Sequence, residues 1–124
     1  MRKFRQNKLW RDKAIEKLER RGSRIHWRRL DHNDFKTALL SKLVEEAKEV
    51  ASSATRHEMV TELADLLEVI EAISQLCEIS EREIREIKEK KFAEKGGFDG
   101  RKFVDFAEHP GGSGAEYYCL QRIS

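Results

Sequence analysis

Residues 43–50 read LVEEAKEV, an apolar helical pattern that contains carboxylates. At helical spacing Leu43, Glu46 and Val50 share one stripe, so Glu46 falls at a position that faces the core. Glu49 lies one turn beyond Glu46 on the same helix. A lone carboxylate among apolar side chains is costly unless it is paired or binds a cation, so the position of Glu46 calls for a positive partner.

A second stretch, ELADLLEV at residues 62–69, repeats the arrangement. Glu62 shares a stripe with Leu66, and Asp65 shares the adjacent stripe with Val69. These stripes contain no Lys or Arg, so four acids that face one interior would repel one another and raise one another's pKa values. A hard divalent cation such as Mg²⁺ takes oxygen ligands and would relieve the repulsion. On spacing alone, a metal site and a structural ion-pair network are both consistent with the sequence.

Helices must position these acids. The apolar spacing predicts helices over residues 10–21, about 35–54, 57–77 and 81–95. Asn33 or Asp34 is expected to cap the second of these, and Ser80 with Glu83 forms a capping-box pattern before the fourth. Short connections between long helices favour antiparallel neighbours, so we expect an all-α domain.

Composition and cysteine usage favour a folded domain in a reducing compartment. Hydrophobic residues and charged residues each make up 39% of the 124 residues, and no apolar run approaches the roughly 20 residues of a membrane span. The basic start has no apolar segment behind it, so no secretory signal is expected. Cys77 continues an apolar helix face and is expected to be a buried thiol, which fits the cytoplasm. Near the end, residues 110–114 predict a loop, and YYCL (residues 117–120) predicts a short strand or an apolar anchor.

Charge is distributed unevenly along the chain. Residues 1–36 hold 13 Lys/Arg and five Asp/Glu, whereas residues 37–124 hold 12 Lys/Arg and 18 Asp/Glu. The basic N-terminal third could bind polyanions, and it could equally pair with the acidic body. A helical module that binds nucleic acid or a protein partner is therefore an alternative. It gives no reason for acids at Glu46 and Glu62, which makes nucleic acid the less favoured partner, but charge alone does not separate a nucleotide ligand from a nucleic acid.

The order of motifs resembles a known family. EEAKE (residues 45–49), followed after 12 intervening residues by ELAD (residues 62–65), resembles the E-x-x-E…E-x-x-D signature of the MazG-like all-α nucleoside triphosphate pyrophosphohydrolases. That superfamily includes phosphoribosyl-ATP pyrophosphohydrolase and the dimeric dUTPases. KLWRDK (residues 8–13) looks like the KLVRDK opening of one branch, and KFAEKGGF (residues 91–98) looks like the ending of that branch.

The resemblance covers about residues 8–98 and implies a domain organisation. Residues 1–98 would form an antiparallel helical bundle of the MazG-like type, which includes the basic N-terminal segment and is completed by dimerisation. Residues 99–124 would be a C-terminal extension. A homodimer or higher homo-oligomer is the state that the resemblance implies, without a membrane partner.

The resemblance also implies an activity and residue roles. Members hydrolyse a nucleoside triphosphate between the α and β phosphates to a monophosphate and pyrophosphate, with Mg²⁺, or Mn²⁺ as a substitute. Nucleotide house-cleaning is the expected function, and phosphoribosyl-ATP hydrolysis in histidine synthesis is the alternative. Glu45 would act as the base that orients the attacking water, or would support the metal ligands indirectly. The metal ligands would be Glu46, Glu49, Glu62 and Asp65, and the residues that contact phosphates or close the pocket would be Lys8, Arg11, Lys13, Lys91 and Lys95.

Overall fold

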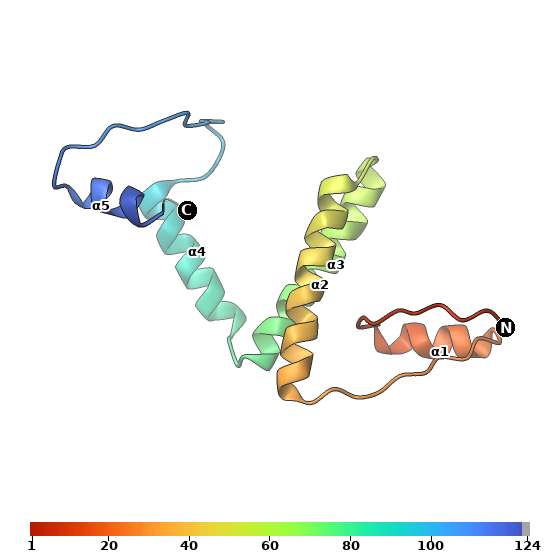
Figure 1. Ribbon diagram of the computed structural model, residues 1–124. Helices are drawn as coiled ribbons and strands as arrows, with labels where there is room; N and C mark the ends of the chain where they lie inside the picture. Colours follow the sequence, from red (N-terminus) through yellow and green to blue (C-terminus); the bar gives the residue numbers. More distant parts are fainter. Residues whose placement is uncertain (123–124) are drawn as a thin grey trace. The chain divides into compact units, whose positions relative to one another are not determined.

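The computed structural model describes residues 1–122, which form α-helices and no strand (Figure 1). The helices are α1 (Asp12–Arg20), α2 (His32–Ser52), α3 (Arg56–Leu76), α4 (Glu81–Lys95) and α5 (Gly114–Gln121). The expected all-α class is thus confirmed. Among the described residues, no helix is both long enough and apolar enough to cross a bilayer.

The chain comprises two compact units, residues 1–87 and the residues from Lys88 on. The carboxylate motifs and the basic segment belong to the first unit, whereas the KFAEKGGF stretch belongs to the second. The expected domain boundary after residue 98 stays a prediction.

Helix α1 ends in a glycine stop, as the sequence predicts. Gly22 has φ +97°, a left-handed conformation that glycine adopts without steric cost. The N–H of Gly22 donates to the carbonyl of Glu19, and the N–H of Ser23 donates to the carbonyl of Leu18. This pair of bonds is a Schellman motif, which satisfies carbonyls that the helix end leaves free.

Helix α2 begins earlier than expected because Asp31 is its N-cap. The Asp31 carboxylate accepts a hydrogen bond from the backbone N–H of Asp34 at 2.8 Å. The expectation that Asn33 or Asp34 caps this helix is wrong, since both residues lie in the first helical turn. Asp34 still suits that position, because an acidic side chain is favourable near the positive end of the helix dipole.

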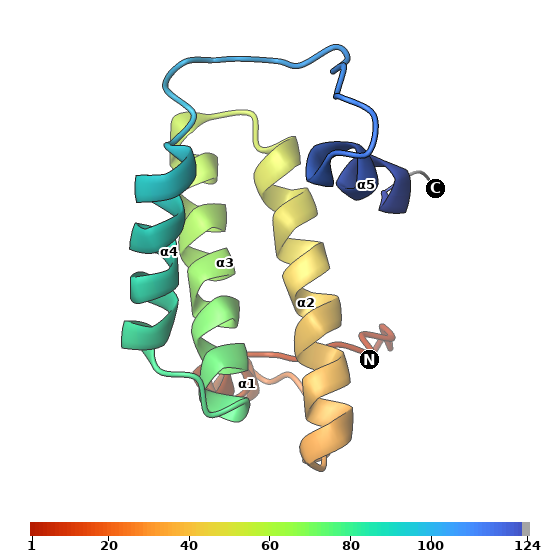
Figure 2. The same cartoon turned by 90° about the vertical axis from the view of Figure 1, so that its left-hand side faces the viewer.

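Helices α2 and α3 pack against each other as an antiparallel hairpin joined by residues 53–55 (Figures 1 and 2). Thr55 caps α3 by accepting a hydrogen bond from the N–H of Glu58 at 3.1 Å. The buried apolar residues of the described chain are few: Leu39 is 4% exposed and Val69 is 8% exposed. Cys77, which was expected to be buried, is only half-buried.

The two remaining helices begin at serine residues. Before α4, the N–H of Ser80 donates to Glu83 at 2.7 Å and the N–H of Glu83 donates to Ser80 at 3.1 Å, which confirms the predicted pattern. YYCL lies inside α5, so the strand alternative for this stretch is wrong. Ser113 accepts a hydrogen bond from the N–H of Glu116 at 3.2 Å and starts α5, and this S-x-x-E spacing is visible in the sequence.

Candidate functional site

Three carboxylates converge where α2 faces α3. Oxygen atoms of Glu46 from α2 and of Glu62 and Asp65 from α3 lie within 4.8 Å of one another. We call these three residues the acid cluster. The helical spacing places Glu46 on the packed side of α2, and it places Glu62 and Asp65 on the facing side of α3. Packing of the two helices then brings together acids that are up to 19 residues apart in the sequence.

Glu46 is the most buried member of the acid cluster. It is 8% exposed, and burial is the main cause that raises the pKa of its carboxyl above the ordinary glutamate value. The negative charge of Asp65 and a hydrogen bond with Glu62 raise the pKa further, while the ammonium of Lys42 opposes the shift. The site therefore disfavours the charged form of Glu46 and would gain from an added cation.

Lys42 supplies a positive charge that the sequence reasoning missed. Its Nζ lies 3.8 Å from Glu46 Oε1 and 3.9 Å from Glu45 Oε1. The interior stripes contain no Lys or Arg, but Lys42, on a neighbouring stripe, reaches Glu46 along the helix at i, i+4 spacing. That spacing is itself the signal that could have found it.

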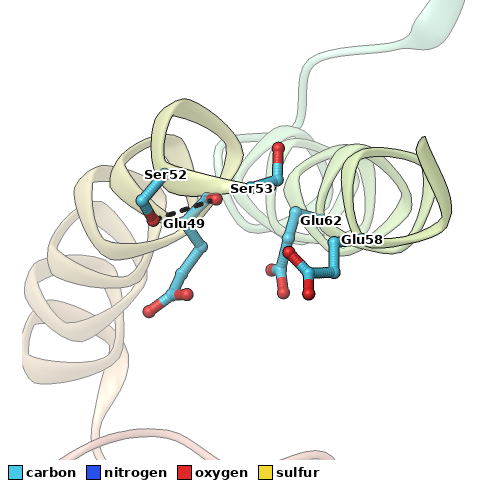
Figure 3. Close-up of a pocket in the computed structure, with 5 residues that line it drawn as sticks. All are labelled: Glu49, Ser52, Ser53, Glu58 and Glu62. Carbon is cyan, nitrogen blue, oxygen red and sulfur yellow. Dashed lines mark hydrogen bonds between the residues drawn. The ribbon is translucent and has the colours of Figure 1, made fainter. Parts of the chain in front are cut away.

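Glu49 lies outside the acid cluster, in an adjoining pocket of about 280 Å³. The pocket is lined by Glu49, Ser52 and Ser53 from the end of α2 and its cap, and by Glu58 and Glu62 from α3. Figure 3 shows the carboxylates of Glu49, Glu58 and Glu62 directed to the same side of the hairpin. Glu62 belongs to both groups, so the structure places Glu49 beside the cluster and adds Glu58, which the sequence reasoning did not single out.

Two basic residues of the N-terminal segment reach the hairpin from far away in the sequence. Arg11 Nη2 donates to Asp65 Oδ1 at 2.8 Å, and Lys8 Nζ donates to Glu45 Oε1 at 3.4 Å. Glu45 is half-buried on α2 next to Glu46, but its carboxylate is not one of the three that gather in the cluster. The structure thus brings Lys8, Arg11 and Glu45 to the edge of the acid cluster.

The other three residues predicted to bind phosphate are exposed lysines. Lys13 lies on α1 with an exposed side chain. Lys91 and Lys95 are exposed on α4, in the second unit. Their roles stay predictions.

The donor set is chemically suited to a hard divalent cation. Three carboxylates offer only oxygen atoms, and Mg²⁺ or Mn²⁺ prefers such ligands, with water and phosphate oxygens completing the coordination. The nearby cations Lys42 and Arg11 make an ion-pair network at the same place. Of the two expectations from the sequence, the ion-pair network is present here, and the metal site stays a prediction.

Comparison of the chain with protein-family models, with curated proteins and with solved structures finds no match.

Proposed function

We propose that the protein is a Mg²⁺-dependent nucleoside triphosphate pyrophosphohydrolase with a MazG-like helical bundle. The observation that carries the proposal is the acid cluster of Glu46, Glu62 and Asp65, with oxygen atoms within 4.8 Å of one another and with Lys8 and Arg11 at its edge. Carboxylates for the metal and basic groups for phosphates are the two chemistries that a metal-bound triphosphate requires. The resemblance of the EEAKE, ELAD and KLWRDK stretches to MazG-like enzymes supports the same activity.

The acidic and the basic residues of the chain would have separate roles. Glu46, Glu62 and Asp65 would hold Mg²⁺, and Glu49 would join them as a ligand or hold a water molecule in the adjoining pocket. Bound Mg²⁺ would offset the charge of the triphosphate and lower the pKa of a bound water. Glu45 would accept the proton of the attacking water, which replaces pyrophosphate on the nucleotide. Lys8 and Arg11 would bind phosphate oxygens.

A nucleotide panel tests the activity. Purified protein should release pyrophosphate from at least one canonical, modified or phosphoribosylated nucleotide when Mg²⁺ is present, and chelation should abolish the release. Glu46→Gln and Asp65→Asn should each lower the rate by roughly 100-fold or more, because each removes a charge that holds the metal. Glu68→Gln, on the exposed surface of α3, is the matched control. A folded wild-type protein that releases no pyrophosphate from any member of the panel would contradict the proposal.

The alternative of a basic binding module has less support. Lys8 and Arg11, which belong to the basic segment, pair with acids of the hairpin. Charges used in this way are less available to nucleic acid. We therefore expect any DNA or RNA binding to be weak and to disappear at moderate salt.

We also propose that two copies of the chain complete the site. Helix α3 carries a second apolar stripe, Val60, Leu63, Leu67 and Ile70, which is 38–65% exposed. An exposed apolar stripe on a packed hairpin is typical of an interface. The pocket of about 280 Å³ is also slightly smaller than the roughly 300–1,000 Å³ of small-molecule sites, so a partner copy would supply further walls for base and sugar.

A further inference from the structure

The segment of residues 8–11, which we call the N-terminal strap, is tied to both helices of the hairpin. Lys8 is paired with Glu45 of α2 at 3.4 Å, and Arg11 is paired with Asp65 of α3 at 2.8 Å. Leu9 and Trp10, between them, are half-buried. The two ion pairs join residues that are 37 and 54 positions apart, so the strap is held at the acid cluster by tertiary contacts.

The Arg11 contact falls on a member of the acid cluster itself. A separation of 2.8 Å is that of a charge-assisted hydrogen bond, and Asp65 Oδ1 is its acceptor. The guanidinium can only donate, so it occupies one of the carboxylate lone pairs, which a metal ion could also use. Arg11 is therefore a cation attached to the chain at the place where the proposed function puts a metal.

This contact is suited to exchange. The side chains of Arg11 and Asp65 are 61% and 36% exposed, so water can replace either partner. Exposed ion pairs contribute little to stability, which keeps the energy of opening small. A divalent cation next to Asp65 would offset the carboxylate charge that holds Arg11 and would repel the guanidinium directly.

We propose that Arg11 and the divalent cation compete for Asp65, so that Arg11 holds this carboxylate in the metal-free protein and leaves it when the metal binds. This inference rests on the proposed function, because it requires the cluster to bind a metal. Released from Asp65, Arg11 carries an unpaired positive charge beside the metal site, where a phosphate oxygen of the metal-bound nucleotide is its next partner. Binding of the metal thus prepares the phosphate-binding group.

A direct titration distinguishes competition between Arg11 and the metal from a role of Arg11 in orienting Asp65 for metal binding. Mg²⁺ binding is measured by calorimetry, without nucleotide, on the full-length wild type, on Arg11→Gln and on Arg20→Gln. Arg20 pairs with Glu16 within α1, so its substitution removes the same charge and an exposed ion pair outside the acid cluster. Competition predicts that Arg11→Gln binds Mg²⁺ about two- to fivefold more tightly than the wild type, the factor that corresponds to an exposed ion pair. Arg20→Gln should bind as the wild type does.

The outcomes are distinct. If Arg11→Gln binds Mg²⁺ as tightly as the wild type does, or more weakly, Arg11 does not compete with the metal, and the proposed enzymatic function is unaffected. Weaker binding would indicate that Arg11 orients Asp65 as a metal ligand. If the folded wild type binds no Mg²⁺ at all, the metal site fails and the competition fails with it. A rise in ionic strength should reduce the difference between the wild type and Arg11→Gln, because salt screens the ion pair.

Discussion

Glu46 is an acid at a buried position of α2, and its surroundings determine how the metal-free protein responds to pH. Burial, the charge of Asp65 and a hydrogen bond with Glu62 raise the pKa of Glu46, and Lys42 only partly opposes them. A raised pKa means that the folded state holds the proton more tightly than the unfolded state does. The stabilisation that comes from protonated Glu46 is therefore complete below the ordinary glutamate pKa, and it is lost as the pH rises through the raised value.

Replacement of Glu46 by Gln should thus stabilise the metal-free protein at neutral pH. Gln cannot ionise, so the variant avoids a buried charge that the wild type must carry. Chemical unfolding in a chelating buffer should show that the variant's advantage grows as the pH rises from the ordinary glutamate range toward neutrality. Glu68→Gln, an exposed substitution on α3, is the control and should show no such trend. A constant difference at every pH would refute this reading of Glu46.

Metal binding should reverse that penalty. A ligand that binds only the folded state stabilises it by about 2.7 kcal/mol at 100 times its dissociation constant. Addition of Mg²⁺ should therefore raise the unfolding midpoint of the wild type, and chelation should remove the increase. Glu62→Gln should abolish the response, because Glu62 belongs to the acid cluster and also lines the adjoining pocket. An equal increase in the wild type and in Glu62→Gln would place the bound Mg²⁺ elsewhere.

At the scale of the elements, the α2–α3 turn holds the two acid motifs in register. Thr55 begins α3 through its hydroxyl, which accepts from the N–H of Glu58. Glu58 in turn accepts a hydrogen bond from the N–H of Ala54 at 2.7 Å. The first bond satisfies a donor at the start of α3, and the second ties the turn between α2 and α3 to the first turn of α3. Glu58 therefore has a structural role as well as a place in the pocket.

Loss of this cap should destabilise the hairpin. Thr55→Ala removes the acceptor and should lower the free energy of unfolding by about 1 kcal/mol. Thr55→Ser keeps the hydroxyl and should lie close to the wild type. Denaturant titration of both variants provides the measurement. Equal stability of the Ala variant and the wild type would mean that solvent satisfies the helix start equally well.

At the scale of the molecule, little apolar surface is buried within the described chain. Leu39 and Val69 are its buried hydrophobic residues, while Leu67 on the second stripe of α3 remains 65% exposed. Burial of one Leu side chain contributes roughly 1.5–3 kcal/mol. A twofold-symmetric interface would bury each such residue in both copies of the chain. Association of two copies would therefore supply stabilisation that the hairpin by itself lacks.

Leu67→Glu should weaken self-association. The substitution puts a charge on the proposed interface and leaves the buried side of α3 unchanged, so the dimer dissociation constant should rise about tenfold or more. Sedimentation of the wild type and the variant over a range of concentrations provides the measurement. Glu71→Gln, an exposed substitution on α3, is the control. A wild type that sediments as a monomer at all concentrations would contradict the proposed dimer.

Local sequence determined the helices and most of their ends. Apolar periodicity and absence of Gly and Pro define α2 and α3, and capping boxes and glycine stops depend on residues only a few positions apart. The two errors about helix starts, at α2 and at α5, also concern local sequence. Asp31 was a third acceptor beside Asn33 and Asp34, and the S-x-x-E start of α5 was read as part of a loop.

The composition of the site depended on tertiary structure. Spacing along each helix placed four acids on the apolar sides, but only the packing of α2 against α3 decided that Glu46, Glu62 and Asp65 converge and that Glu49 lies beside them. The contact of Arg11 with Asp65 crosses 54 residues, so no local pattern encodes it. The physical reason is that helical periodicity fixes the direction of a side chain about its own axis, whereas distances between elements are set by how their surfaces pack.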